Sequence, residues 1–206
     1  MNTEAADATD VVDIVFGLRG RVVDLDHADR LWRGLHLRMP WLDGEEGAGV
    51  HPLAGVSRGD GEMYLTRRAR LTLRLPRHRG DDARMLVGAR LDLGGEVEVA
   101  DETTVRPLAP AKVLYSPFVT MGETDEGRFL AACREQLAAA GIVGDLVCGK
   151  ARQATGEYGG WSGFSLMVHG LGAEESLRLQ RQGLGGERKR GCGIFVPHKA
   201  VAAVGE

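Results

Sequence analysis

The 206-residue sequence lacks the features that define membrane and secreted proteins. No apolar run approaches the roughly 20 residues that a transmembrane helix needs, and no basic-then-apolar leader opens the chain. The three cysteines, Cys133, Cys148 and Cys192, are odd in number and widely spaced, which argues against a disulfide framework. We therefore expect a cytoplasmic protein with reduced thiols and no membrane partner.

Aromatic residues and metal-binding motifs are also scarce. Aromatic side chains make up 5% of the chain, which makes extended stacking on nucleic-acid bases a weak prospect. Neither His-x-x-x-His nor Cys-x-x-Cys occurs, and no dense group of acids has the spacing of metal ligands. The sequence therefore predicts neither a metal ion nor an organic cofactor.

Positive charge is concentrated in two stretches of a chain whose net charge is −3. Residues 64–90 contain eight arginines against two acids, and residues 178–199 contain six basic residues against one acid. Local charge, more than the sum, decides whether a protein binds nucleic acid. Two interpretations remain open: basic surfaces for nucleic acid, or solvated arginines on exposed faces of strands and helices.

Apolar periodicity in the first half predicts the element order β-α-β-β-α-β, the ferredoxin-like unit. A helix is expected at residues 26–39, with Asp24 or Asp26 as its N-cap and Pro40 as its end. The other expected elements are extended segments at residues 10–18, 49–56, 68–75 and 91–99 and a short helix at residues 81–88. A Gly-Gly pair in the last segment indicates a bulge or a turn.

The second half repeats this order without visible sequence identity to the first. The expected elements are strands at residues 112–119, 146–154, 163–169 and 193–196 and helices at residues 125–140 and 173–182. Pro107 and Pro110 punctuate the chain between the halves. We therefore predict an α+β protein of two tandem ferredoxin-like (RRM-like) domains, residues 10–106 and 107–206, after a disordered tail at residues 1–9.

Glycines and cations combine in one loop near the C-terminus. Gly183-Leu184-Gly185 and Gly191-Cys192-Gly193 bracket five residues that include Arg188, Lys189 and Arg190. Glycine allows the backbone to approach a ligand closely, and exposed N–H groups in such loops bind anions. A helix precedes this loop instead of following it, which excludes a Walker loop and a dinucleotide-binding fingerprint. The alternative is a long connecting loop with solvated charges.

This loop resembles the glycine-rich loop of the repeat-associated RNA-binding superfamily of CRISPR systems. More narrowly, the chain resembles the CRISPR-associated endoribonuclease known as Cas family six, in its MYXAN-subtype branch. The loop is the specific part of the resemblance, and the rest of the chain supports it. The stretches that carry it are residues 10–35, 49–53, 70–76, 114–119 and 176–199.

The resemblance implies an endonuclease that cuts precursor CRISPR RNA within its repeats without a metal. In such enzymes the ribose 2′-hydroxyl attacks the adjacent phosphate, which leaves 2′,3′-cyclic phosphate and 5′-hydroxyl ends. A histidine of the first domain usually acts as general acid or base. The implied partners are the RNA repeat, expected as a hairpin, and a CRISPR interference complex as a candidate second partner.

Proton transfer in this reaction suits histidine, whose ordinary pKa is near 6.5. The first candidate is His27, at the start of the first expected helix, where family catalysts commonly lie. The second is His51, before Pro52 on the next extended segment, as partner or as principal catalyst. Each has a structural alternative: an exposed first-turn residue for His27, and a residue that fixes a bend for His51.

Phosphate contacts are expected from arginines of the first domain and from the loop. Arg68, Arg70 and Arg74 share one face of a strand with period two, which suits a phosphate track. The full set of expected phosphate-binding residues is Arg19, Arg21, Arg68, Arg70, Arg74, Gly183, Gly185, Arg188, Lys189, Arg190, Gly191 and Gly193. Two other functions remain open: a non-catalytic RNA-binding subunit of a CRISPR effector complex, and a ferredoxin-like regulatory or small-molecule-binding protein.

Overall fold

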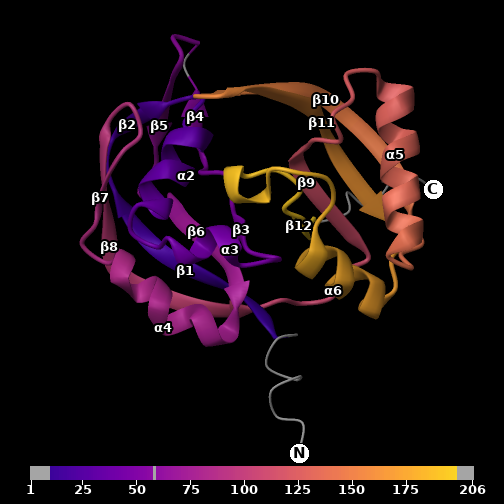
Figure 1. The fold of residues 1–206 in the computed structure, drawn as a ribbon, viewed down its shortest axis with the longest axis horizontal. Coiled ribbons are helices and arrows are strands. Elements are labelled where there is room, and N and C mark those ends of the chain that lie inside the picture. Colours follow the sequence, from indigo (N-terminus) through magenta and orange to yellow (C-terminus); the bar gives the residue numbers. More distant parts are fainter. Residues whose placement is uncertain (1–9, 58, 199–206) are drawn as a thin grey trace, which may run out of the picture. The chain divides into compact units, whose positions relative to one another are not determined.

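The computed structural model describes residues 10–57 and 59–198, and the tail predicted at residues 1–9 lies outside them. The contacts of the chain divide it into two units, with the main division between Leu108 and Ala109 (Figure 1). Two short later segments, Ala154–Trp161 and Glu187–Gly191, belong to the first unit. The first unit therefore differs from the contiguous block 10–106, because both segments contact its first helix. Among the described residues, no helix is long and apolar enough to cross a membrane.

A five-stranded sheet forms the centre of the first unit. Its strands, in spatial order, are β3 (Gly49–Val50), β6 (Arg70–Pro76), β1 (Val11–Arg19), β8 (Glu96–Pro107) and β7 (Arg90–Asp92). Neighbouring strands are antiparallel, and Asp13 of β1 lies opposite Arg74 of β6. If β1, β3, β6 and β8 are numbered in chain order, the spatial order is 2-3-1-4, the ferredoxin-like arrangement.

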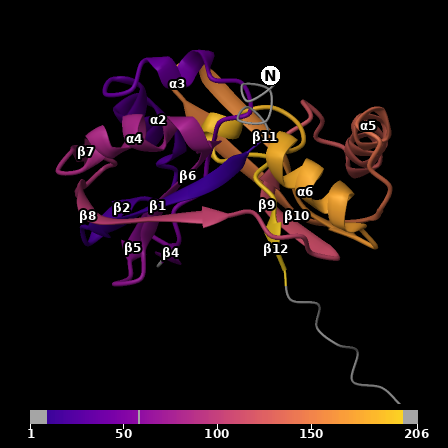
Figure 2. The ribbon, with the colours of Figure 1, turned by 90° about the horizontal axis from the view of Figure 1, so that it is seen from below.

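Helices cover one face of this sheet, as Figure 2 shows. They are α2 (Ala28–His36), α3 (Trp41–Gly44), η1 (Arg77–Arg79), α4 (Gly80–Ala83) and η2 (Arg84–Leu86). Leu31 and Leu35 of α2 are buried in one core with Ile14 and Phe16 of β1. A separate three-stranded sheet consists of β2 (Val22–Asp24), β5 (Glu62–Leu65) and β4 (Gly55–Ser57).

The second unit repeats the arrangement with a four-stranded sheet. In spatial order its strands are β10 (Asp145–Gly156), β11 (Gly159–His169), β9 (Val113–Val119) and β12 (Val196–Pro197), again 2-3-1-4. The helices are α5 (Glu126–Ala139) and α6 (Ala173–Gln182), and the loop after α6 contains the short η3 (Arg188–Arg190). Phe129 of α5 packs on Phe164 of β11, with ring centroids 4.9 Å apart. The predicted fold class is therefore confirmed.

Several predicted boundaries were wrong for local reasons. The first helix ends at His36, and Pro40 precedes the next helix, α3, because the fixed φ of proline suits a helix start. Among the described residues no side chain caps α2, since Asp26 bonds Thr155 and Asp24 pairs with Arg30.

Two predicted extended segments are each two strands. Residues 49–56 contain β3 and the start of β4, and residues 91–99 form a hairpin of β7 and β8 around the Gly-Gly pair. The last strand is shorter than predicted, because Gly193 has a φ of 65° and the extended backbone resumes only at Val196.

Candidate active site

A buried ionic cluster lies where β1, β3 and β6 of the first unit are adjacent. The Asp13 carboxylate accepts hydrogen bonds from Arg74 Nε at 2.8 Å and Arg74 Nη2 at 2.9 Å. Nε2 of His51 lies 3.2 Å from the same carboxylate. The side chain of Arg74 is 1% exposed, and those of His51 and Asp13 are 15% and 17% exposed. Because an ionised carboxylate only accepts, Nε2 of His51 carries a proton and Nδ1 is left as the basic nitrogen.

The charges of this cluster determine its protonation. Burial raises the pKa of Asp13, but hydrogen bonds from His51 and Arg74 outweigh burial and hold the pKa well below its usual range. Burial lowers the pKa of His51 below 6.5, and the charges of Arg74 and Arg188 lower it further against the opposing effect of Asp13. At neutral pH His51 is therefore a neutral imidazole, the form that accepts a proton.

Arg188 brings the glycine-rich loop to this cluster. Its turn, η3, packs against β3, and the backbone of Gly191 approaches Pro52, the residue after His51. Burial, and then the nearby charge of Arg74, lower the pKa of Arg188 to about 10, so the guanidinium remains charged at neutral pH. The structure thus brings together one predicted histidine, His51, and one predicted loop cation, Arg188.

Two of the three loop cations contact protein groups of the first unit and are not simply solvated. Lys189 donates to the backbone carbonyl of Asp43, and its ammonium lies 5.9 Å from the ring centroid of Trp32. Arg190 donates to Asp29 at 2.9 Å and to Glu187 at 2.7 Å. Glu187–Gly191 therefore belong to the first unit, where α2 offers them a carboxylate and an indole ring.

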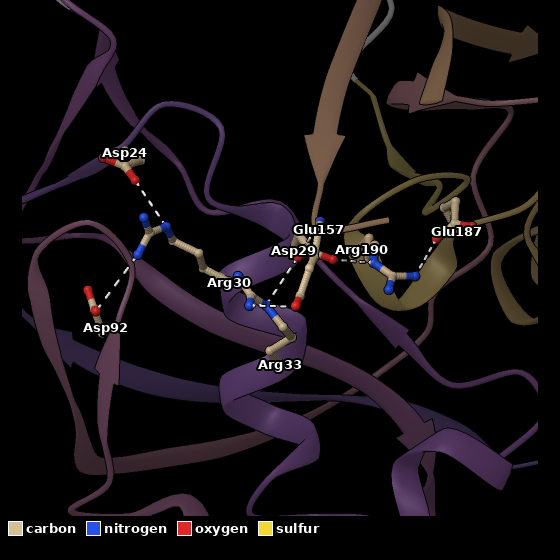
Figure 3. A network of polar contacts seen from close by, with 8 residues as sticks. All are labelled: Asp24, Asp29, Arg30, Arg33, Asp92, Glu157, Glu187 and Arg190. Atoms are coloured by element: carbon tan, nitrogen blue, oxygen red, sulfur yellow. Dashed lines mark hydrogen bonds and ion pairs between the residues drawn. The ribbon is translucent and has the colours of Figure 1, made fainter. Parts of the chain in front are cut away.

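Asp29 of α2 joins three segments of the first unit (Figure 3). Its carboxylate accepts hydrogen bonds from Arg190 Nε at 2.9 Å and from the backbone N–H of Glu157 at 3.3 Å, and it pairs with Arg33 at 3.1 Å. Arg33 also donates to the Glu157 carboxylate at 2.9 Å. The tip of the β10–β11 hairpin and the turn η3 are therefore both fastened to the first turn of α2.

His27 has a different environment. It precedes α2 as the N-cap residue, its side chain is buried, and Nδ1 lies 2.9 Å from the carbonyl oxygen of Asp24. Burial lowers the pKa of His27. This effect outweighs the backbone groups of Asp24 and Leu25 and the charges of Asp26 and Asp24, which raise the pKa. The charged groups that act on His27 are Asp26 and Asp24, whose charge would repel a phosphate near the imidazole. Both aspartates also line a polar cavity of about 380 Å³, together with Arg30 and Arg33.

The predicted arginines of the first domain divide into two groups. Arg19, Arg21 and Arg68 are exposed, and Arg70 is partly exposed and lies 3.7 Å from Glu102. Arg74 does not extend a phosphate track along β6, because its side chain is buried against Asp13 of the adjacent strand. The track prediction is therefore wrong for Arg74, which belongs to the cluster around His51.

The loop glycines shape the backbone and direct their amides inward. Gly183, Gly185, Gly191 and Gly193 all have positive φ, between 65° and 86°. A Cβ on Gly185 or Gly193 would lie 2.1 Å from a backbone oxygen. The N–H of Gly185 donates to Gln136 at 3.0 Å, and that of Gly193 donates to the Phe118 carbonyl at 2.7 Å. The expected anion-binding use of these amides is therefore corrected, since both are committed to protein acceptors.

Two residues of the site, Asp13 and Asp29, were absent from the sequence prediction. Asp13 interrupts the apolar run of β1, and an acid inside a buried strand signals a charged partner. Asp29 gave a weaker signal, because acids in the first turn of a helix are common without any tertiary role. Within residues 10–57 and 59–198, no group of three His, Cys, Asp or Glu is arranged to hold a metal ion.

Comparisons with known proteins agree on one family. Residues 12–200 match the family model described as Cas6 CRISPR. The chain is 37% identical over 196 residues to the "CRISPR-associated endonuclease Cas6" of Myxococcus xanthus, covering 94% of this chain and 84% of that protein.

Solved structures show the same fold at low sequence identity. A Cas6-related protein from Pyrococcus furiosus superposes with a TM-score of 0.67 at 12% identity, covering 92% of this chain and 99% of that one. A structure described as "An RAMP protein binding different RNA substrates" gives a TM-score of 0.62 at 12% identity, with coverage of 89% and 98%. The sequence resemblance is confirmed, and the chain belongs to the Cas6 family of CRISPR-associated endonucleases.

Proposed function

We propose that the protein is a metal-independent endoribonuclease that cuts precursor CRISPR RNA within its repeats. The family supports CRISPR RNA as the substrate, and a structural relative is described as binding different RNA substrates. The expected products carry a 2′,3′-cyclic phosphate on one fragment and a 5′-hydroxyl on the other. The expected substrate is a repeat hairpin, whose stem is recognised mainly through shape and phosphates.

The cluster around His51 supplies the groups for this reaction. Neutral Nδ1 of His51 takes the proton of the ribose 2′-hydroxyl, and the 2′-oxygen attacks the adjacent phosphorus. The bond from phosphorus to the 5′-oxygen breaks, and solvent protonates that oxygen. Arg188 stabilises the negative charge that builds on the phosphorane, and Asp13 holds the imidazole in the required tautomer.

One observation carries the choice of His51 over His27: the turn that carries Arg188, η3, packs against β3, the strand that directly precedes His51, and the charge of Arg188 acts on the imidazole. A phosphate that approaches His51 meets a guanidinium, whereas one that approaches His27 meets aspartates. Arg74 adds positive charge while remaining bound to Asp13. His27 remains the second candidate because it lies at the start of the first helix.

The test is cleavage of end-labelled repeat RNA in excess EDTA, with analysis of the product ends. We expect cleavage at full rate, a fragment that ends in a cyclic phosphate, and loss of cleavage in His51→Ala. Loss of activity in EDTA that magnesium restores would contradict metal independence. Tight binding of intact RNA without cleavage would instead favour a non-catalytic RNA-binding subunit.

A further inference from the structure

Asp29 is a buried carboxylate outside the cluster around His51. It is 5% exposed and lies in the first turn of α2, where it contacts Arg190, Arg33 and the backbone of Glu157 (Figure 3). A buried carboxylate is stable only when several donors satisfy it, and these three contacts do so. Asp29 therefore fixes the positions of the groups bound to it.

Arg190 is held on several sides. In addition to Asp29 and Glu187, the guanidinium carbon lies 5.9 Å from the ring centroid of Trp32 and 5.8 Å from that of Trp161. A planar guanidinium between two carboxylates and two indole rings has little freedom to rotate. Asp29 is the more deeply buried carboxylate, with 8% side-chain exposure against 38% for Glu187, so it contributes more to the anchoring.

The anchored residue is two positions from Arg188 within one tight turn. The N–H of Arg190 donates to the Glu187 carbonyl at 2.9 Å, and that of Gly191 donates to the Arg188 carbonyl at 3.2 Å. These bonds hold η3 as a rigid turn, so a displacement of Arg190 also displaces Arg188. Arg188 and Arg74 carry like charges, which repel each other. The pair of Asp29 and Arg190 fixes the turn that carries Arg188 on α2.

We propose that Asp29 is a positioning residue that, through Arg190, holds Arg188 beside His51 for the cleavage step. The inference rests on the proposed function of His51 and Arg188. The charged groups that face His51 are Asp13 from β1, Arg74 from β6 and Arg188 from η3. Among them Arg188 is the one carried by a loop, and Asp29 fixes the position of that loop.

The first experiment compares Asp29→Asn with the matched control Asp26→Asn. Asp26 binds the same hairpin as Asp29, accepting a hydrogen bond from the Thr155 N–H at 2.7 Å. It is Asp29, however, that accepts the hydrogen bond from Arg190 of η3. Asp29→Asn should slow single-turnover cleavage of the repeat RNA about 100-fold, because a misplacement of about 1 Å has effects of this size. Affinity for a repeat with a 2′-deoxy cut site should change much less. Equal rate losses in both variants would overturn the proposal.

A double-mutant cycle separates positioning from general destabilisation. If Asp29 acts through Arg188, Asp29→Asn should have no further effect on the rate in an Arg188→Gln background. Rate losses that multiply in the double variant would overturn the proposal. If Asp29→Asn melts below the assay temperature, Arg190→Gln replaces it in the same cycle, with the same expected outcome.

A third measurement needs no nuclease activity. Proton NMR titration of His51, assigned by its loss in His51→Gln, reports whether Arg188 still lies beside the imidazole. Asp29→Asn should shift the His51 titration midpoint upward, as Arg188→Gln does, while Asp26→Asn should leave it unchanged. If the midpoint shifts upward but the protein cleaves no RNA, the proposed function is disproved. The role of Asp29 in holding Arg188 beside His51 is then still supported. An unchanged midpoint in Asp29→Asn would disprove the positioning alone.

Discussion

His27, which is buried, and His51, which is largely buried, are two imidazoles of the same unit with opposite surroundings. In each, one ring nitrogen is occupied by a nearby oxygen, and burial lowers the pKa of both. His27 has Asp24 and Asp26 as its charged neighbours, whereas His51 has Arg74 and Arg188 beside its Asp13 partner. This difference in charge is the reason for proposing that His51 is the imidazole that meets an anionic substrate.

In this comparison, position in the sequence and surrounding charge favour different histidines. His27 occupies the expected place at the start of the first helix, but its charged neighbours are two acids that precede that helix, Asp24 and Asp26. The basic partner of His51 comes from a loop near the other end of the chain. The proposal for His51 therefore rests on the charges around it and not on its place in the element order.

Equal roles of the two histidines in cleavage would be the clearest evidence against this distinction between them. His51→Ala should slow single-turnover cleavage about 1,000-fold, or about 4 kcal/mol, the range expected for loss of a general base. His27→Ala should slow it by less than about tenfold, because its acidic surroundings exclude phosphate. Binding to a 2′-deoxy repeat is the control for folding. A larger loss in His27→Ala would reverse the assignment.

Arg188 provides a second test, because its charge acts on His51 but is not among the charges that act on His27. Arg188→Gln should reduce the cleavage rate about 100-fold, the usual cost of removing one group that stabilises transition-state charge. Arg188→Lys should recover part of the rate, since it restores charge without the planar fork. An unchanged rate in Arg188→Gln, measured at saturating enzyme, would remove the basis for preferring His51.

The pH dependence of cleavage tests the protonation of His51. A general base works when unprotonated, and the pKa of His51 is lowered, so the acid limb of the rate profile should have its midpoint below pH 6.5. Arg188→Gln should move this midpoint upward. A midpoint above 6.5 in the wild type would contradict the arrangement.

The same shifts make stability depend on pH. The unfolded chain binds protons on both histidines at a higher pH than the folded chain does. The free energy of unfolding should therefore fall as the pH decreases through 6.5. Urea titrations between pH 5 and pH 7.5 would measure this, and His51→Gln should flatten the dependence.

The smallest effect is expected at the exposed arginines. Arg68→Gln should weaken RNA binding and reduce the slope of log affinity against log salt by about 0.7 to 0.9, the contribution of one phosphate contact. Its single-turnover rate at saturation should be that of the wild type. A loss of rate at saturation would place Arg68 among the groups that act on the reacting phosphate.

Much of the fold followed from local patterns. The helix at residues 173–182 was predicted with the bounds it has, because its amphipathic pattern lies between Gly172 and Gly183. Apolar runs and the alternation of apolar and polar residues predicted strands of the two main sheets. The order of these strands and the helices between them predicted the tandem ferredoxin-like class. The interruption of residues 91–99 was visible as two glycines, but local sequence did not distinguish a bulge from a hairpin.

The site was less predictable, because its contacts join residues that are distant in sequence. Periodicity placed Arg74 on a strand face, but the face alone did not reveal Asp13 on the neighbouring strand. The three cations of the loop were predicted to contact phosphate, whereas Arg190 binds Asp29 of α2 and Lys189 binds the Asp43 carbonyl of α3. Such long-range pairing depends on the fold as a whole, which a local pattern does not encode.

The inclusion of Glu187–Gly191 in the first unit has a consequence for synthesis on the ribosome. Domains generally begin to fold from the N-terminal side while translation continues, and β1, β3 and β6 are all made early. Arg188 follows His51 by 137 positions, so a nascent polypeptide contains the imidazole long before it contains the loop cation. The proposed site therefore cannot be complete until the segment with Arg188 has been translated.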